Sequence, residues 1–250
     1  MSTRKTILIT GASRGIGRAA ALLAGRRGWS VGVNYVQDEA GAEAVVKEIK
    51  RSGGRAVAVH GDVGFEADIL EMFEATVRGL GPLDGVVVNA GVVAPTARLV
   101  DMSVARMRRV FDINVLGAYI CAREAARRLS TSMGGRGGSI VLVSSAAARL
   151  GSPNLYVDYA GSKGAIDTLT LGLCKELGPE GVRVNGVRPG LIETDIHASG
   201  GEPDRAHRLG VSCPLGRPGL PDEVGEAIVW LLSDEASYTT GAILDVSGGR

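Results

Sequence analysis

The short segment YAGSK places Tyr159 and Lys163 four residues apart, with only small residues between them. On a helix these two side chains lie on one face, one turn apart. A phenol with its ordinary pKa of about 10 exchanges protons poorly near neutral pH, and a nearby ammonium group lowers that pKa. The spacing therefore indicates an acid–base pair. The alternative without chemistry is a solvated pair on a helix surface.

A second pattern, TGASRGIGRA, covers residues 10–19 and follows a short apolar run. Its glycines, Gly11, Gly15 and Gly17, permit positive φ angles and a close approach of a phosphate to the backbone. They also start a helix whose free N–H groups face an anion. The alternative is a tight strand–helix connection without a ligand. Because the pattern follows the first strand of an alternating chain, it favours a dinucleotide phosphate, with G-x-x-x-G-x-G in place of the usual G-x-G-x-x-G.

Metal and disulfide chemistry is not indicated by the remaining reactive side chains. Three histidines without ligand spacing are interpreted as loop or surface residues: His60, His197 and His207. Three widely spaced cysteines predict neither a disulfide framework nor a zinc site: Cys121, Cys174 and Cys213. A reducing cytoplasm fits this cysteine usage.

A serine hydrolase is also not favoured, because no G-x-S-x-G turn surrounds Ser145 and no histidine follows in a convincing position. The run Arg123–Arg128 is rich in arginine. We interpret it as a solvated helix face with i,i+4 pairing of Glu124 and Arg128. Neither feature points to a catalytic site of its own.

Composition narrows the class of protein further. Hydrophobic residues make up 45% and charged residues 22% of the 250 residues, which is typical of a globular chain with material for one large α/β domain. The net charge of +1 gives no general attraction for nucleic acid. The N-terminal apolar run is too short for a signal peptide, and no run is long enough to span a bilayer. We therefore expect a soluble, cytoplasmic protein.

Runs rich in Val and Ile alternate with helical patterns, as in β-α-β units around a parallel sheet. Seven strands are predicted: 6–10, 31–35, 56–62, 85–91, 139–145, 182–190 and 242–248. Helices are predicted near 16–27, 39–52, 66–78, 103–129, 157–177 and 222–232. Two loops stand apart, residues 130–139 and the long segment 193–219, and the second is expected to form a substrate loop or lid.

Several motifs together, in order and approximate spacing, resemble the short-chain dehydrogenase/reductase family over nearly the whole chain. They are Thr10-Gly11-Ala12-Ser13-Arg14-Gly15-Ile16-Gly17, Asn89-Ala90-Gly91, Asn114, Ser144-Ser145, Tyr159-x-x-x-Lys163 and Pro189-Gly190. The resemblance implies an α/β fold in which residues 1–250 form a single doubly wound Rossmann domain. In that domain a seven-stranded parallel sheet is flanked by helices.

The resemblance also implies a catalytic set. Tyr159 would donate or accept the proton, and Lys163 would assist it and hold the nicotinamide ribose. Ser145 would hold the substrate oxygen, and Asn114 would hold a water in a proton relay. Ser144 stays an alternative to Ser145, because the span from Ser145 to Tyr159 is one residue longer than in many members of the family.

The same resemblance implies cofactor contacts, with the adenine beside Asp62-Val63 and the carboxamide beside Thr194. The predicted cofactor-binding residues are Gly11, Ser13, Arg14, Gly15, Ile16, Gly17, Asn34, Tyr35, Asp62, Val63, Asn89, Ala90, Gly91, Tyr159, Lys163, Pro189, Gly190, Ile192 and Thr194.

The cofactor choice is predicted from the end of the second strand, where an acidic residue binds both ribose hydroxyls of NAD. This chain has Asn34-Tyr35-Val36 there, and Asp38 falls in the next turn. Arg14 in the glycine loop is placed to pair with a 2′-phosphate. The sequence therefore predicts NADP(H) over NAD(H).

The function predicted on these grounds is hydride transfer between NADP(H) and a small carbonyl or alcohol substrate, as in ketoreductases or 3-oxoacyl-carrier-protein reductases. The alternatives are a sugar dehydrogenase of the same family and a non-catalytic dinucleotide-binding regulatory protein. No nucleic-acid or membrane partner and no metal is expected. We predict a homotetramer, since an apolar edge strand near the end of the chain needs covering.

Overall fold

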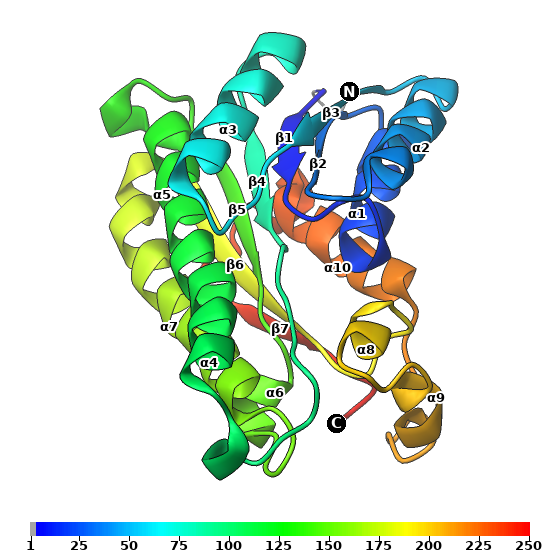
Figure 1. Cartoon of the computed structure of the whole chain (residues 1–250). Coiled ribbons are helices and arrows are strands. Elements are labelled where there is room, and N and C mark those ends of the chain that lie inside the picture. The colour runs from blue at the N-terminus through cyan, green and yellow to red at the C-terminus, as the bar shows by residue number, and fades with distance from the viewer. Residues whose placement is uncertain (1–3) are drawn as a thin grey trace.

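Seven parallel strands form one sheet at the centre of the protein, in a computed structural model that describes residues 4–250 (Figure 1). The strands are β1 (Thr6–Ile9), β2 (Ser30–Tyr35), β3 (Arg55–His60), β4 (Gly85–Val88), β5 (Gly138–Val143), β6 (Val182–Pro189) and β7 (Ile243–Val246). Their order in the sheet is β3-β2-β1-β4-β5-β6-β7. The predicted fold class, a doubly wound seven-stranded α/β sheet, is confirmed.

The winding of the chain reverses at β1, which pairs with β2 on one side and with β4 on the other. Open α/β sheets bind ligands outside the carboxyl ends of the strands at such a switch point. Every residue of β1 and β4 is buried, as expected for parallel strands that are covered on both faces.

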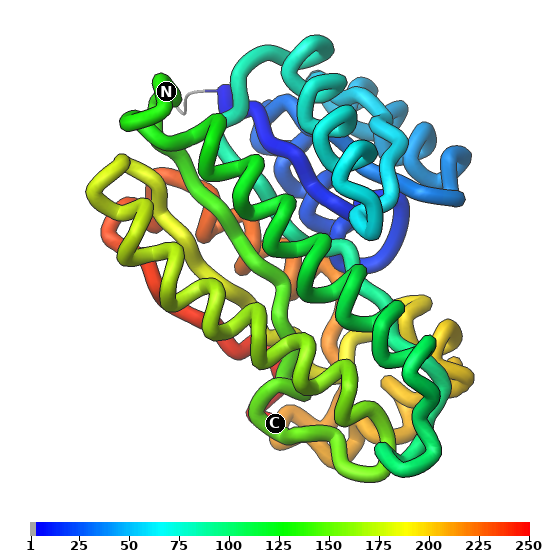
Figure 2. The backbone as a smooth tube through the Cα atoms, turned by 60° about the vertical axis from the view of Figure 1, so that its left-hand side comes forward, coloured from blue at the N-terminus to red at the C-terminus, as the bar shows by residue number. Residues whose placement is uncertain are grey.

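Helices cover both faces of the sheet and bury two separate apolar layers. One face carries α1 (Gly15–Arg26), α2 (Glu39–Arg51) and α10 (Pro221–Leu232). The other face carries α3 (Glu66–Leu80), α4 (Val104–Phe111), α5 (Ala118–Leu129) and α7 (Val157–Leu177). On this second face α5 and α7 lie side by side (Figure 2).

The predicted helix 103–129 differs from the structure in its middle. A π-helical segment, Asp112–Gly117, joins α4 to α5 and contains Asn114. One-turn π segments insert a residue into the i→i−4 ladder and are frequent at functional sites. Hydrophobic periodicity does not reveal such an insertion, because the helix axis continues through it.

The predicted lid segment 193–219 also contains regular structure that the sequence did not indicate. Two short helices lie in it, α8 (Ile196–Ser199) and α9 (Arg205–Gly210). Figure 1 places both beyond the carboxyl ends of the strands, near α10. A further short helix, α6 (Ala147–Leu150), follows β5 on the other side of that edge. We refer to residues 193–219 as the lid segment below.

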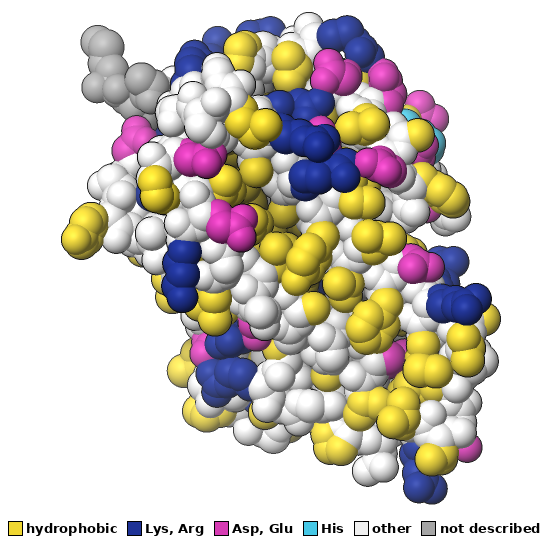
Figure 3. All heavy atoms as spheres, turned by 90° about the vertical axis from the view of Figure 1, so that its left-hand side faces the viewer, with side chains coloured by type: hydrophobic (Ala, Val, Ile, Leu, Met, Phe, Trp, Pro, Cys, Tyr) yellow, Lys and Arg dark blue, Asp and Glu magenta, His cyan; other side chains and the backbone are white. Residues whose placement is uncertain are grey.

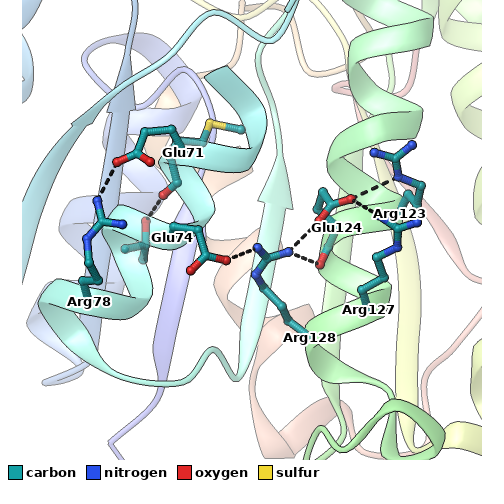
Figure 4. A network of polar contacts seen from close by, with 9 residues as sticks. Glu71, Glu74, Arg78, Arg123, Glu124, Arg127 and Arg128 are labelled. Carbon is teal, nitrogen blue, oxygen red and sulfur yellow. Dashed lines mark hydrogen bonds and ion pairs between the residues drawn. The ribbon is translucent and has the colours of Figure 1, made fainter. Parts of the chain in front are cut away.

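The arginine-rich face of α5 is only partly as predicted. The pair Glu124–Arg128 is present, but Glu124 is only 2% exposed, so this face is not simply solvated. Its carboxylate accepts from Arg123, Arg127 and Arg128, and Arg128 also pairs with Glu74 of α3 (Figure 4). Those charges hold the pKa of Glu124 below its ordinary value against the opposing effect of burial. The network ties α5 to α3.

The cysteines, the possible metal ligands and the apolar helices relate to chemistries that the sequence did not indicate. Within residues 4–250 the three cysteines are free, and no group of three or more His, Cys, Asp and Glu side chains is arranged to hold a metal ion. No helix in the same residues has the length and apolar character needed to cross a membrane.

Candidate active site

A cavity of about 170 Å³ opens at the carboxyl ends of β4, β5 and β6. Its lining combines residues of the catalytic and cofactor sets predicted above: Ile16, Asn89, Gly91, Ser144, Ser145, Tyr159, Lys163, Pro189, Gly190, Ile192 and Thr194. These residues are far apart in the sequence, and the sheet topology brings them together at the predicted edge.

Tyr159 and Lys163 lie in the first two turns of α7 and meet as their spacing predicts. The Lys163 Nζ atom is 5.7 Å from the centroid of the Tyr159 ring. Lys163 is buried, and its Nζ donates a hydrogen bond to the Val143 carbonyl at 2.7 Å, at the end of β5. The lysine is therefore fixed by the sheet and not by solvent.

The two serines after β5 have different surroundings. Ser145 is half-buried, and its hydroxyl lies near enough to the Tyr159 phenol to lower the pKa of that phenol. Ser144 is buried and donates its hydroxyl proton to the Lys163 carbonyl at 3.0 Å. The geometry therefore places Ser145 beside the phenol, while Ser144 holds the backbone of α7 against β5.

Burial dominates the proton affinity of this pair. It raises the pKa of Tyr159 above its ordinary value, and the hydrogen bond from Ser145 opposes that effect. The net lowering of the phenol pKa that the sequence predicts is thus not found in the protein chain alone, where burial has the largest effect. Burial also lowers the pKa of Lys163 to about 8, and the negative charge of Asp167 opposes this shift. The ammonium group is therefore itself removed from water, and it donates a hydrogen bond to the Val143 carbonyl.

Asp167 was not predicted from the sequence, although it lies one turn beyond Lys163 on α7. Its Oδ2 accepts from the Arg188 Nε and Nη2 atoms at 3.0 and 2.9 Å. Its Oδ1 is buried and has no hydrogen-bond partner within residues 4–250. Arg188 also lies 3.6 Å from Asp245 of β7, which pairs with Arg149 of α6. The (i, i+4) spacing from Lys163 was the available signal.

Asn114 uses its side chain to join the loop after β4 to α7. Its Oδ1 accepts from the Val92 N–H at 2.8 Å, and its Nδ2 donates to the Val92 carbonyl and to Ser162 Oγ. A Cβ atom at Gly91 would lie 3.2 Å from Asn114 Oδ1 and 3.5 Å from Lys163 Nζ. Asn114, Gly91 and Lys163 therefore lie together, and the proton-relay role of Asn114 stays a prediction.

The glycine loop is held tightly against β4. Gly11 and Gly15 have φ angles of 63° and 55°, in the left-handed region that favours glycine. A Cβ atom at Gly17 would lie 2.4 Å from the Gly11 carbonyl oxygen, so α1 can approach the sheet only with glycine there. Asn89 Nδ2 donates to the Thr10 and Gly11 carbonyls at 2.8 and 3.0 Å. No side chain caps the start of α1, which leaves its N–H groups free for an anion.

Asn34 has a different role from the predicted cofactor contact. It is only 1% exposed, and its Oδ1 accepts from the Gly11 N–H at 2.9 Å. Its Nδ2 donates to the Val59 and Gly61 carbonyls at 3.3 and 2.9 Å, with a longer contact to Tyr35 O. Because every polar atom of the amide is used, Asn34 positions the glycine loop and does not face a cofactor.

The remaining predicted cofactor residues lie along the same edge. Tyr35 ends β2, half-buried, with its ring edge-on to His60 at 5.5 Å. Arg14 is exposed immediately before α1, and Ser13 beside it is half-buried. Asp62 and Val63 follow β3; Val63 is buried, and Asp62 Oδ1 accepts from the Gly64 N–H at 2.8 Å. Ala90 is half-buried, and its N–H donates to Thr10 Oγ1 at 2.9 Å.

Polar and aromatic side chains outside the predicted catalytic and cofactor sets also line the cavity, among them Tyr156, His197, Arg205 and Arg250. Tyr156 lies three residues before Tyr159, a spacing that could have indicated it. The others come from the lid segment and from beyond β7, and no local pattern connects them to Tyr159. Among these residues, Arg205 and Arg250 add positive charge to the lining of the cavity.

Comparisons with known proteins show which family this chain resembles over its length. A family model described as enoyl-(acyl carrier protein) reductase matches residues 11–250. An Escherichia coli K12 protein named uncharacterized oxidoreductase YgfF is 49% identical over 97% of this chain and 98% of its own. L-rhamnose 1-dehydrogenase (NAD(P)(+)) of Sphingomonas sp. SKA58 is 39% identical, over 98% of this chain and 95% of its own. The crystal structure of a dehydrogenase/reductase from Sinorhizobium meliloti 1021 superposes with a TM-score of 0.90 at 34% identity, covering 100% of this chain and 95% of that one.

Proposed function

Because this chain belongs to the short-chain dehydrogenase/reductase family of oxidoreductases, we propose that it is an NADP(H)-dependent reductase of small carbonyl compounds, working reversibly on the corresponding alcohols. The observation that carries the proposal is the contact of Ser145 with Tyr159 beside a buried Lys163, in a cavity that also reaches the glycine loop.

A dinucleotide fits the residues present. The uncapped start of α1 offers free N–H groups to the pyrophosphate, and the clash that a Cβ at Gly17 would make shows how closely helix and strand approach there. Gly11, Gly15 and Ile16 would hold the phosphates, and Asn89, Gly91, Pro189 and Thr194 would hold the nicotinamide end. When bound, the nicotinamide supplies or accepts the hydride.

The side chains of the chain itself would manage the proton. In reduction, the Tyr159 hydroxyl donates its proton to the substrate oxygen as that oxygen gains negative charge, and the Ser145 hydroxyl donates a hydrogen bond to the same oxygen. Lys163 then stabilises the resulting phenolate by its positive charge. The Val143 carbonyl keeps the ammonium in place. In alcohol oxidation the same groups act in reverse.

The preference for NADP(H) is supported by what surrounds the end of β2. Asp38, the nearest acid, accepts from the Gly41 N–H at 2.9 Å and caps α2. Asn34 is buried, whereas Arg14 is exposed at the start of α1. A 2′-phosphate would meet the Arg14 guanidinium there, while the Asp38 carboxylate is engaged by the Gly41 N–H.

The cofactor preference is tested by kcat/KM with NADPH and NADH. We expect Arg14→Ala to lower kcat/KM for NADPH by about 10-fold or more, as for a lost charge-assisted hydrogen bond, and to leave NADH within about twofold. Arg26→Ala, which removes an exposed arginine at the other end of α1, is the matched control. Comparable kcat/KM for both cofactors in the native protein, or an NADH preference that survives Arg14→Ala, would contradict the assignment.

A sugar dehydrogenase is the second candidate, favoured by the 39% identity to a protein named L-rhamnose 1-dehydrogenase. One substrate panel separates the candidates: NADPH oxidation with ketones and 3-oxoacyl thioesters against NADP⁺ reduction with aldoses. Turnover of aldoses alone would favour the sugar dehydrogenase. A cofactor that binds without turnover of any member would favour a non-catalytic dinucleotide-binding protein.

We also propose that the protein is a homotetramer in which the lid segment covers the substrate. Figure 3 shows apolar side chains gathered on the face that α4, α5 and α7 form. Exposed apolar residues of these helices and of the π-helical segment are Phe111, Leu116, Tyr119 and Leu171. Leu244 of the edge strand β7 is 39% exposed as well. Burial of these side chains favours association. A monomeric mass by light scattering at micromolar protein would overturn the tetramer.

A further inference from the structure

Two arginines, Arg205 and Arg250, line the cavity, and their positive charge limits the substrate. We propose that the substrate bears an anionic oxygen group, a carboxylate or a phosphate monoester, which Arg205 and Arg250 bind while its carbonyl lies at Tyr159. This inference rests on the proposed reductase function and adds the chemical class of the substrate. It follows from the surroundings of each guanidinium and from the charge of the whole lining.

Arg250 presents a donor that nothing else satisfies. The residue is half-buried and lines the cavity, and its Nη1 atom is buried without a hydrogen-bond partner within residues 4–250. Its backbone is held by Ser247, whose Oγ donates to the Arg250 carbonyl at 3.0 Å. A buried guanidinium nitrogen without an acceptor is costly, and a bound oxyanion would remove that cost.

Arg205 lies on α9 of the lid segment, with only 9% of its surface exposed. Its guanidinium carbon is 5.1 Å from the centroid of the Tyr156 ring, and this stacking fixes its plane. Its Nη1 atom lies 3.3 Å from Glu202 Oε1. A strong charge-assisted hydrogen bond is about 2.7–2.9 Å long, so this contact is a weaker one. Arg205 therefore keeps donor capacity toward the cavity.

Glu202 does not neutralise this end of the cavity. Its carboxylate also accepts from the Tyr156 hydroxyl at 3.2 Å and from Arg208, so one negative charge faces two guanidinium groups. Glu202 itself does not line the cavity. The cluster of Glu202, Arg205 and Arg208 thus carries a net positive charge.

The described side chains that line the rest of the cavity include no carboxylate. Among the described residues that line the cavity there is no aspartate or glutamate, whereas Lys163, Arg205 and Arg250 are cations. His197 also lines it, and burial lowers the pKa of His197, which keeps its ring neutral near pH 7. Apolar side chains, including Leu150, Leu191 and Ile196, occupy the remaining wall.

Both ends of such a substrate would meet tyrosines that line the cavity. Tyr156 is the N-cap of α7, and Tyr159 lies in the first turn of that helix. Arg205 stacks on the first of these rings, and the substrate oxygen would bind at the second. A short carbon chain between the carbonyl and the anionic group would span this separation along the apolar wall.

The test compares matched pairs of substrates that differ in charge at fixed ionic strength: acetoacetate against methyl acetoacetate, and dihydroxyacetone phosphate against dihydroxyacetone. We expect kcat/KM for the anionic member of at least one pair to be about 10-fold higher, as a charge-assisted hydrogen bond provides. Arg250→Gln should remove this preference and Arg205→Gln should reduce it, each by lowering kcat/KM for the anionic member more than for the neutral member. The pair that shows the preference distinguishes carboxylate from phosphate.

Arg208→Gln is the matched control, because Arg208 pairs with the same Glu202 but does not line the cavity. It should keep the preference for the anionic member. Equal or better turnover of both neutral members, or an equal loss for both members of a pair in Arg250→Gln, would overturn the inference and leave the reductase function standing.

A binding measurement separates the two proposals where turnover is absent. Calorimetric titration of the NADP⁺-loaded protein with acetoacetate and with dihydroxyacetone phosphate should show binding of at least one of them that Arg250→Gln weakens by about 10-fold. Such binding without turnover of any carbonyl would overturn the reductase function and support the anion site. Failure of both anions to bind would overturn the anion site.

Discussion

The two sides of the cavity are built in different ways. On the sheet side, polar side chains bond to the backbone of other elements: Asn34 to the glycine loop, Asn89 to β1, Asn114 to the loop after β4, and Lys163 to β5. On the lid side, ion pairs between charged side chains, such as Glu202–Arg208 and Arg217–Glu223, accompany backbone hydrogen bonds such as Glu193 N–H to the Gly219 carbonyl.

This difference teaches where the molecule is rigid. When a buried side chain that bonds to the backbone moves, it leaves a polar group without a partner. Each such group costs about 1–3 kcal/mol of free energy. Ion pairs at the surface contribute about 0–1 kcal/mol, since water replaces them readily. The sheet side can therefore hold the reacting groups in place, while the lid segment can open at little cost to the fold.

The largest expected effect lies on the sheet side, at the reacting pair. Tyr159→Phe removes one hydroxyl and leaves the ring and backbone, so kcat should fall about 100-fold or more while NADPH binding is kept. Lys163→Ala should lower kcat and also weaken NADPH binding, because it removes a cation and a proposed ribose contact. The measurements are kcat and NADPH affinity by fluorescence. An unchanged kcat in Tyr159→Phe would end the proposed mechanism.

A smaller effect is expected at Asp167, whose negative charge acts on Lys163 one turn earlier on α7. Burial lowers the pKa of Lys163 to about 8, and the negative charge of Asp167 raises it. Asp167→Asn should therefore lower that pKa further, so the ammonium is lost at a lower pH. The alkaline limb of the pH–rate profile for reduction should move to lower pH, with little change in rate near pH 6.

The pH–rate profile is the measurement for Asp167, because a purely structural loss would scale the rate at every pH. Asp222→Asn on α10, an exposed aspartate, is the matched control and should leave the limb in place. A limb that stays fixed in Asp167→Asn would show that Asp167 serves only its ion pair with Arg188.

The smallest effect on stability is expected on the lid side. Arg217→Gln removes the exposed ion pair with Glu223, and the free energy of unfolding should change by less than about 1 kcal/mol. Hydrogen exchange of backbone amides within residues 193–219 should become faster, while that of β1 and β4 stays unchanged. Urea unfolding and hydrogen exchange test this prediction. A uniform gain in exchange over the whole chain would contradict the distinction between the two sides.

Sequence patterns predicted the parts of the molecule that local rules determine. The Val- and Ile-rich runs gave all seven strands, because buried parallel strands need apolar side chains on both faces. The i,i+4 spacing of Tyr159 and Lys163 gave their shared helix face, because helix geometry alone fixes it. The glycines of residues 10–19 indicated the tight turn into α1, because glycine permits positive φ angles and a close approach of helix and strand.

Other features depend on contacts between distant segments and could not be predicted in this way. The side chain of Asn34 bonds to β3 and to the glycine loop, so its position at the end of β2 misled the assignment of a cofactor contact. Glu124 is buried by helix α3, which the pattern of α5 does not show. The choice between Ser144 and Ser145 required the fold, because neighbouring residues after a strand point in opposite directions.

The hydrogen bonds of Asn34 have a consequence for protein engineering. A designer who wanted to change the proposed preference from NADP to NAD would first place an acidic residue at the end of β2. Aspartate at position 34 would lose the donors to the Val59 and Gly61 carbonyls and set a buried charge against both oxygens. The redesign should therefore leave Asn34 intact and introduce its carboxylate at the more accessible Tyr35 or Val36, where a new side chain disturbs no bond that holds the glycine loop.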